Sequence, residues 1–494
     1  MVLNVNPVKI RQNRSLGGVE GSLYSYAAEL AVLGEVEFAR NLVSVLYKEG
    51  SPTGMFSHAD RRLALAWELS GQGPDGATEE GVRQTAEEMR EVYGAVSSGK
   101  QITFDRKGLE KCLAILRNRS DIEKARGPDA IFVIALDISL RVNGDIQNHR
   151  TGTAMSLRSG TQIPKVPEED MDARRLRVSN LDETSAELVK ELVANWQKRP
   201  ADHFLIAEKL WPYYCRGLFA DATGISAEDL KSKGERLVQA FSDRLSYGYM
   251  ANGLETKTTR DLLEIGEKNT LRGPGLEHWE ASGDDIPETY FTQPVTSEQV
   301  AELEIRLETN LPQDYKEFLS ITNGFGSGTV LEDGIYNGYF PDPELYAIDK
   351  VAWLSEEWVG LPCELLEIPR EIEDPYRKEM KDWDSWDTAM PLLDRVVHVG
   401  RRDIDDLWLV PPKLVQEAKE SYLKMLENGD EMQQKILRRA MGDFAGSMEA
   451  FESLEWCCVK NSSGGSACRT FYPSFRAYLE DVVDQSAECR ASSR

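Results

Sequence analysis

The sequence predicts an α+β protein, with an all-α N-terminal region followed by a C-terminal domain in which helices pack on a mixed or antiparallel sheet. Apolar residues recur at three- and four-residue spacing through much of 21–275, which is the period of amphipathic helices. Two hairpin-turn signals, Asp333-Gly334 and Asn337-Gly338, lie between short β-prone runs in the C-terminal part. Helical periodicity returns after residue 411, and this order of helices, strands and helices is typical of an α+β domain.

The N-terminal region divides into two helical parts. Leu23, Tyr26 and Leu30 indicate a first helix, and Gly34 indicates the turn into the next one. No second copy of this pair recurs at a fixed period, so a repeat array is not predicted. The predicted boundaries are a tail at 1–20, helices at 21–143, a linker at 144–180, helices at 181–275 and a linker at 276–295.

The C-terminal domain is predicted to span 296–486, with 487–494 as a tail. Thr296 is a candidate N-cap of its first helix, and Pro312 suits the first position of a second helix because proline lacks an N–H that would be unpaired there. Asp314 lies in the first turn of that second helix, where the helix dipole favours an anion. Gly324 is the expected left-handed terminator.

Three further strands and four helices are predicted after the hairpin segment. Strands are expected at 395–399, 407–410 and 456–459, because these runs are short, apolar and rich in β-branched or aromatic residues. His398 alternates with valines in the first of them and is expected on an exposed face. Helices are predicted within 411–454 and over 472–482.

Several segments of this domain resemble the SUKH superfamily. The resemblance lies in a first helix with a Leu-Glu pair, the run Leu-Pro-x-Asp-Tyr-x-x-Phe-Leu followed by Asn-Gly, an Asp-x-Trp strand, and a closing Tyr-Pro-Ser-Phe-x-x-Tyr-Leu. The residues that carry these motifs are Leu303, Glu304, Leu311, Pro312, Asp314, Tyr315, Phe318, Leu319, Asn323, Gly324, Asp406, Trp408, Trp456, Tyr472, Pro473, Ser474, Phe475, Tyr478 and Leu479. The helical insertion and the terminal Ser-Phe look closest to the fungal branch, the cell-wall assembly and glucan-synthesis regulators. Asp405 departs from the pattern, since many members carry a glycine there.

The resemblance implies a non-enzymatic module that binds other proteins. Fungal members look like scaffolds that link signalling to wall synthesis, with kinases or wall-synthesis components as partners. Bacterial relatives look like immunity proteins that neutralise toxins or nucleases, so an inhibitor of a basic toxin is an alternative function. An enzyme whose site lies in the helical region is a third alternative. Most of the motif residues also have a simple structural interpretation as core residues or hydrogen-bond anchors.

The charge of the chain limits its partners. The formal net charge is −25, and residues 295–494, with 21 Lys and Arg against 39 Asp and Glu, account for −18 of it. This field repels nucleic-acid phosphates and anionic lipid surfaces and favours a basic protein partner. The alternative is that the acidic residues serve only solubility. No apolar run is long enough to span a bilayer, and the first residues do not form a secretory signal. The seven scattered cysteines do not form a disulfide framework, which indicates the cytosol or nucleus.

Four tryptophans in an acidic stretch are the candidate partner-binding residues. Trp353, Trp358, Trp383 and Trp386 lie among residues such as Glu356 and Asp374. Protein interfaces favour tryptophan anchors surrounded by a charged rim. The simpler alternative is that these tryptophans cover the sheet and that the acidic residues form a solvated loop.

We find no motif for catalysis, a cofactor or a metal ion in the sequence. The run from Gly94 to Lys100 has phosphate-loop spacing, but a helix is predicted before it and Gln101 takes the place of the required Ser or Thr. The five histidines do not form a metal-binding pair, and no Cys-x-x-Cys occurs. Cys457 and Cys458 are predicted to point to opposite faces of a strand, which argues against a redox pair.

Overall fold

The computed structural model of the 494-residue chain contains two compact units, Met1–Gly248 and Tyr249–Arg494. We call these the N-terminal unit and the C-terminal unit and describe each by itself. The residues described are 6–13, 16–49, 63–71, 73–97, 105–117, 134–136, 138–140, 142, 177–196, 210–214, 216–250, 252–272, 287–326, 343–355, 361–368, 370–376, 389–402, 404–462 and 468–488.

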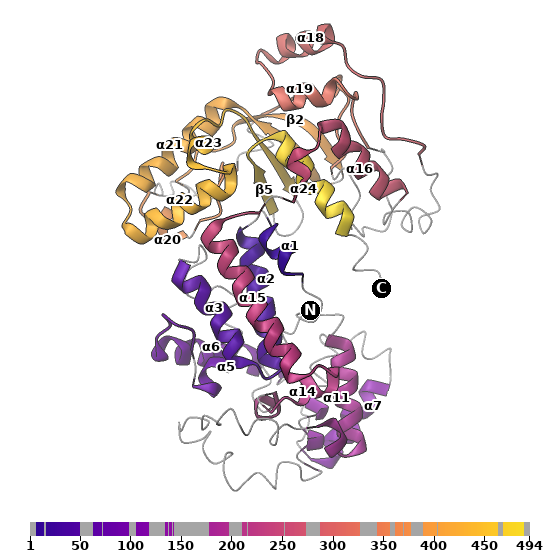
Figure 1. Ribbon diagram of the computed structural model, residues 1–494, viewed down its shortest axis with the longest axis vertical. Coiled ribbons are helices and arrows are strands. Elements are labelled where there is room, and N and C mark those ends of the chain that lie inside the picture. The colour runs from indigo at the N-terminus through magenta and orange to yellow at the C-terminus, as the bar shows by residue number, and fades with distance from the viewer. Residues whose placement is uncertain are drawn as a thin grey trace. The chain divides into compact units, whose positions relative to one another are not determined.

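The N-terminal unit is helical, as predicted, in all of its described residues that have regular structure (Figure 1). Helix α15 packs against α3, and Gly234 of α15 permits this crossing because a Cβ there would lie 2.7 Å from Cγ of Phe38. Residues 144–176 of the predicted linker at 144–180 lie outside the described residues. The helices are α1 (Pro7–Arg11), α2 (Leu16–Val32), α3 (Val36–Glu49), α5 (Ala64–Ser70), α6 (Glu79–Ser97), α7 (Arg106–Arg117), α11 (Glu183–Trp196), α13 (Trp211–Tyr214), α14 (Leu218–Thr223) and α15 (Ala227–Tyr247).

The C-terminal unit is built on a five-stranded sheet in which every neighbouring pair is antiparallel and the strand order is β1-β2-β3-β4-β5. The predicted α+β class is confirmed. A mixed or an antiparallel sheet was predicted, and the sheet is antiparallel. The strands are β1 (Ala352–Ser355), β2 (Arg395–Arg402), β3 (Asp405–Val410), β4 (Cys457–Ser462) and β5 (Cys468–Tyr472).

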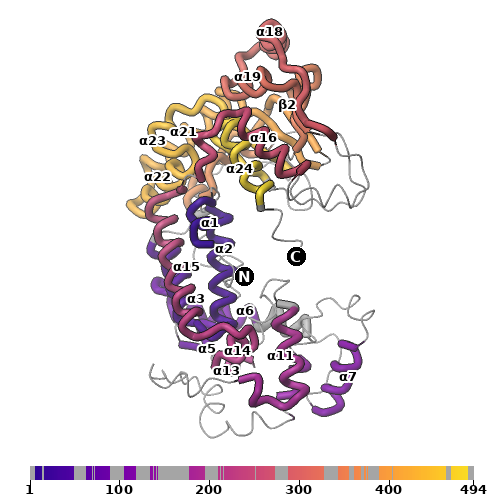
Figure 2. Tube along the Cα trace, turned by 45° about the vertical axis from the view of Figure 1, so that its right-hand side comes forward, coloured from indigo at the N-terminus to yellow at the C-terminus, as the bar shows by residue number. Residues whose placement is uncertain are grey.

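Helices cover both faces of this sheet (Figures 1 and 2). The helical insertion predicted at 411–454 is confirmed as three helices between β3 and β4. Its Tyr422 hydroxyl accepts a hydrogen bond from the backbone N–H of Leu366, at 3.1 Å, which ties the insertion to the segment before α20. The helices of this unit are α16 (Thr259–Leu271), α18 (Ser297–Leu307), α19 (Gln313–Leu319), α20 (Arg370–Glu373), α21 (Pro412–Asn428), α22 (Glu431–Ala445), α23 (Met448–Glu452) and α24 (Phe475–Glu488).

Alternation along the strands assigns side chains to the two faces. Val397, Leu409 and Cys458 belong to the core cluster shared with α16, α18, α19 and α24. Trp408 and Cys457 point to the opposite face, and both are buried. The prediction that the adjacent cysteines point to opposite faces fits this pattern. Both faces are therefore covered, as the nearly continuous burial along β2 and β3 also indicates.

Three features of the C-terminal unit differ from the predicted elements. Strands β1 and β5 were not predicted, and the closing helix begins at Phe475 rather than at 472. Helix α16 was predicted as part of the N-terminal region, but its Leu262 and Leu263 are fully buried in the core of the C-terminal unit. The predicted hairpins around 333–338 lie outside the described residues.

Candidate functional site

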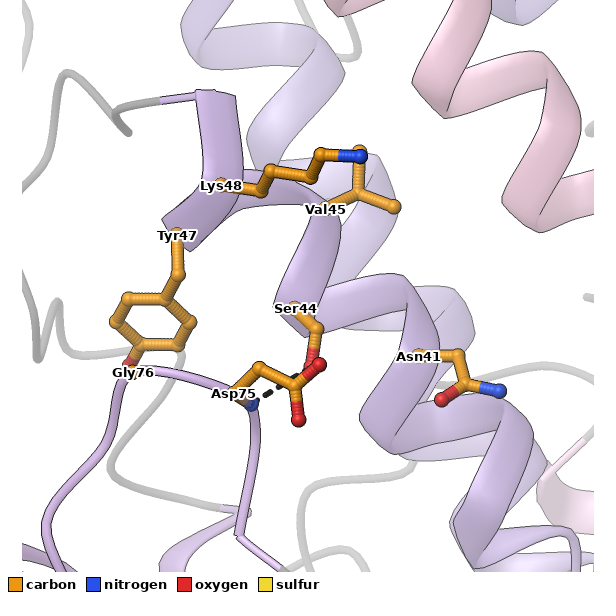
Figure 3. A pocket seen from close by; sticks show the side chains of 7 residues that line it. All are labelled: Asn41, Ser44, Val45, Tyr47, Lys48, Asp75 and Gly76. Carbon is orange, nitrogen blue, oxygen red and sulfur yellow. Dashed lines mark hydrogen bonds between the residues drawn. The ribbon is translucent and has the colours of Figure 1, made fainter.

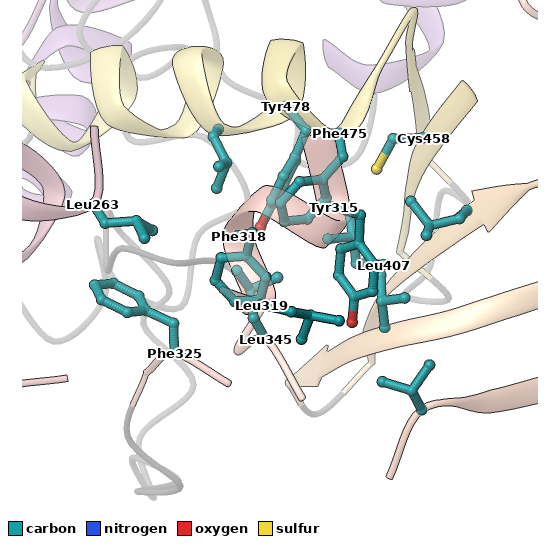
Figure 4. Packing of buried hydrophobic residues seen from close by; sticks show 14 of the residues in the cluster. Leu263, Tyr315, Phe318, Leu319, Phe325, Leu345, Leu407, Cys458, Phe475 and Tyr478 are labelled. Atoms are coloured by element: carbon teal, nitrogen blue, oxygen red, sulfur yellow. The ribbon is translucent and has the colours of Figure 1, made fainter. Parts of the chain in front are cut away.

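The aromatic motif residues meet in one cluster at the centre of the C-terminal unit (Figure 4). The ring centroid of Phe475, at the start of α24, lies 5.0 Å from that of Tyr315 and 5.3 Å from that of Phe318, both on α19. Tyr478, one turn further along α24, lies 5.9 Å from Phe475. All four side chains are 1% exposed or less. These residues form a packed core, so they are not available to a ligand.

Three polar motif residues satisfy backbone groups instead of facing solvent. The carboxylate of Glu304 accepts a hydrogen bond from the N–H of Leu311, at 2.8 Å. The carboxylate of Asp314 accepts one from the N–H of Arg476, at 2.9 Å, and so joins α19 to the first turn of α24. The amide oxygen of Asn323 accepts one from the N–H of Ile348, at 2.7 Å. Glu304 fixes the turn between α18 and α19, whereas Asp314 and Asn323 anchor connections between segments that are distant in the sequence.

The remaining motif residues also have structural roles. Ser474 caps α24 by accepting a hydrogen bond from the N–H of Ala477, at 3.0 Å, and the hydroxyl of Tyr472 donates to Asp481, at 2.8 Å. Pro312 is the N-cap of α19, one position before the predicted one. Trp456 is half-buried against the core, Pro473 is half-buried, and the other apolar motif residues, Leu303, Leu311, Leu319, Trp408 and Leu479, are buried.

Gly324 has the predicted left-handed conformation, with φ +85°, but not the predicted role. Helix α19 ends at Leu319, so Gly324 does not cap it. A Cβ at Gly324 would lie 2.8 Å from the backbone nitrogen of Ala347. The glycine therefore permits two backbone segments to approach closely, and Phe325 and Leu345 exchange hydrogen bonds next to it.

His398 is buried, with 8% of its surface exposed, so the prediction that it lies on an exposed face is wrong. The ring of Tyr346 packs edge-on against it, with a centroid distance of 4.9 Å. Nε2 of His398 lies 2.9 Å from Oδ1 of Asp406, an ion-pair distance without hydrogen-bond geometry. The motif residue Asp406 on β3 thus pairs with a histidine of the neighbouring strand β2. The exposed Arg401 lies close to the same carboxylate, with its Nε 3.8 Å from Oδ1 of Asp406.

Of the four candidate partner-binding tryptophans, the described residues include Trp353. It lies on β1, an edge strand of the sheet, and is half-buried against the core. Its indole N–H donates to the carbonyl of Leu307 at the end of α18, at 2.8 Å, and the guanidinium of Arg395 lies 4.1 Å from its ring centroid. These contacts fix α18 to the sheet edge. The other three, Trp358, Trp383 and Trp386, lie outside the described residues, and their proposed role in binding stays a prediction.

A surface hollow of about 460 Å³ lies in the N-terminal unit between α3 and the loop before α6 (Figure 3). The hydroxyl of Ser44 accepts a hydrogen bond from the N–H of Asp75, at 2.8 Å, which holds the loop against the helix. The polar groups of Lys48 and Asp75 are exposed. Specific small-molecule sites place a few polar groups in a largely apolar enclosure. This hollow does not have that character, so we do not assign it a ligand. The lining residues are Asn41, Ser44, Val45, Tyr47, Lys48, Asp75 and Gly76.

The phosphate-loop spacing does not have the structure that its chemistry requires. Gly94 lies inside helix α6, whereas a phosphate loop follows a strand and precedes a helix. Residues 98–100 lie outside the described residues. In the described parts of the chain, no group of three His, Cys, Asp or Glu residues is arranged to hold a metal ion. None of the described helices is both long and apolar enough to cross a membrane.

Four cysteines are predicted to resist alkylation in the folded protein. Cys112, Cys363, Cys457 and Cys458 are free thiols and are buried. Burial raises the pKa of Cys363 to about 12, and it raises the pKa of each of the other three. Because the thiolate is the reactive form, iodoacetamide at neutral pH should modify these four only after denaturation. Peptide mass spectrometry of native and denatured samples measures this, and rapid labelling of native Cys457 or Cys458 would contradict the described packing.

The C-terminal unit is thus an α+β domain, and the motif residues form its structural core. Residues 294–410 match the SMI1 / KNR4 family (SUKH-1). The C-terminal domain is therefore a member of the SUKH superfamily. The matched segment ends with β3, so β4, β5 and α24, which complete the sheet and the aromatic cluster, lie beyond it. No curated protein and no solved structure shows significant similarity to the chain.

Proposed function

We propose that the protein is a non-enzymatic regulatory adaptor that binds other proteins through its SUKH domain. The observation that carries this proposal is the family match at 294–410, because SUKH domains mediate protein interactions. The burial of the motif residues supports it. Since they build the core, binding is left to side chains on the outer surfaces of the helices and at the sheet edges.

The finer form of the proposal is a role in fungal cell-wall integrity and β-glucan synthesis. It rests on the resemblance of the terminal Ser-Phe and the helical insertion to the fungal branch. The insertion consists of α21, α22 and α23, three helices between two neighbouring strands. Lys419 of α21 holds this insertion by donating to the carbonyls of Glu452 and Leu454, both at 2.7 Å.

Affinity capture of the full chain from the cells that express it tests this function. Kinases or wall-synthesis components, enriched reproducibly over a capture with an unrelated acidic protein, are the expected result. Capture without any specific protein would contradict the adaptor role. A Phe475→Ala variant is the matched control, because disruption of the domain core should abolish specific capture while the N-terminal unit is unchanged.

An immunity-type inhibitor is the second candidate function, favoured by charge. The −18 carried by residues 295–494 would complement a basic toxin or nuclease. This function predicts one tight basic partner instead of several signalling proteins. It also predicts that a nuclease captured in this way loses its activity when the full chain is added in equimolar amount.

A further inference from the structure

Helix α18 has one buried face and one solvent-exposed face. Leu303 and Leu307 point into the core. The opposite face carries Glu298, Glu302 and Ile305, which follow one another at helical spacing. In Figure 1 this helix lies at the outer side of α19, away from the sheet. The second face is therefore open along the length of the helix.

Ile305 is the apolar centre of this open face. It is 76% exposed, compared with 46% for Met432, 40% for Ile404 and 36% for Leu392, the other large exposed apolar side chains of the described C-terminal unit. A single exposed apolar residue is ordinary on a protein surface and does not by itself indicate binding. The surroundings of Ile305 are what distinguish it.

Three carboxylates flank Ile305 and have no ion-pair partner among the described residues. They belong to Glu298, Glu302 and Glu308, which are all exposed. Hydrogen bonds from its own backbone N–H and from the Thr296 hydroxyl lower the pKa of Glu298, so that carboxyl is ionised at neutral pH. The basic side chains nearest in sequence have other partners. Lys316 pairs with Glu304 at 3.1 Å, and Arg306 donates to the carbonyl of Ile348 at 2.7 Å.

Glu308 has a backbone conformation that a glutamate adopts only at a cost. It is the C-cap of α18 with φ 52°, the one non-glycine residue with positive φ in the described parts of the chain. Glycine is the usual residue at such helix ends, and a side chain costs about 1 kcal/mol or more there. Strained residues of this kind cluster at binding sites. A glycine would relieve this strain at position 308, which lies three residues after Ile305 in the sequence.

We propose that the open face of α18, with Ile305 at its centre and Glu298, Glu302 and Glu308 around it, docks a basic amphipathic helix of a partner protein. This inference deepens the proposed adaptor function and rests on it. The partner helix would place apolar side chains on Ile305 and lysine or arginine side chains beside the three carboxylates. A membrane surface or nucleic acid is the wrong ligand, because both are anionic.

Fluorescence anisotropy with the full chain and a synthetic helical peptide tests the surface. The probe carries leucines on one face and lysines on both flanks, and a second peptide has glutamate in place of every lysine. We expect the lysine peptide to bind and the E298Q/E302Q/E308Q variant to bind it about tenfold more weakly, since each exposed charge pair contributes modestly. Ile305→Ser should weaken binding about fivefold, because less apolar surface is buried. The matched controls, E427Q/E431Q/E455Q and Met432→Ser, should bind like the wild type.

A second variant separates binding from folding. Glu308→Gly removes one carboxylate and relieves the backbone strain, so it should make the chain at least as stable and still weaken binding. Equal affinity of the wild type and the α18 triple variant would overturn the proposal. The proposal would also be overturned if the control triple variant lost as much affinity as the α18 triple variant, or if the glutamate peptide bound as tightly as the lysine peptide. The adaptor function would fail differently, through the absence of cellular partners, so the two failures are distinguishable.

Discussion

Replacing Phe475 with alanine is expected to lower the free energy of unfolding of the C-terminal unit by about 3–5 kcal/mol. The ring contacts Tyr315, Phe318 and Tyr478, and it is 1% exposed. Its removal leaves a cavity between α19 and α24, where the two helices are already tied by the Asp314 hydrogen bond.

Hydrogen exchange of the β3 and β4 amides in the full chain measures this loss, because these central strands open only with the whole unit. Phe475→Leu, which keeps most of the volume, should cost less than about 1.5 kcal/mol. Phe444→Ala, at a half-buried ring on α22, is a second control and should cost less than Phe475→Ala. A Phe475→Ala variant as stable as the wild type would show that the aromatic cluster does not hold the domain together.

The second large effect is expected for Gly400→Ala, at about 3 kcal/mol. A Cβ on Gly400 would lie 2.5 Å from the carbonyl oxygen of Glu344, a backbone atom that cannot turn away like a side chain. That same oxygen accepts a hydrogen bond from the N–H of Arg401, at 3.0 Å, and the backbone N–H of Tyr346 donates to the carbonyl of Val399, at 2.8 Å. The substitution should therefore detach the segment around Glu344 from β2.

Gly442→Ala is the matched control for this prediction. A Cβ at Gly442 meets no atom within 4 Å, and the residue lies inside helix α22. Alanine should stabilise that position by as much as about 1 kcal/mol, because glycine is a poor helix former. Thermal unfolding of both variants, followed through the C-terminal unit, compares them directly. Equal stability of the two would contradict the close approach at Gly400.

Local signals predicted a large part of this fold. Thr296 caps α18 as expected, and Gln299 completes a capping box with it. Asp314 and Phe318 lie on the second helix, and β2, β3 and β4 lie where short apolar runs indicated strands. Each of these depends on residues within a few positions of one another, which is why a single sequence was sufficient. The motif residues named above are mostly buried or hydrogen-bonded to backbone groups.

The features that sequence reasoning missed depend on contacts between distant segments. Strand β5 has the sequence Cys-Arg-Thr-Phe-Tyr, which is too short and mixed to stand out, and its pairing with β4 defines it. Helix α16 was recognised as a helix, but nothing local shows that it packs on α24, where Asn269 donates to Ser486 at 3.0 Å. The open face of α18 was missed because Ile305 fits a helical pattern equally well when it is buried.

Cross-linking mass spectrometry of the full chain with its captured cellular partner tests the central claim most directly. The account predicts that lysines of the partner cross-link to acidic residues of the C-terminal unit, through a carboxylate-to-amine reagent, with Glu298, Glu302 and Glu308 among them. Partner cross-links confined to carboxylates of residues 1–248 would contradict it.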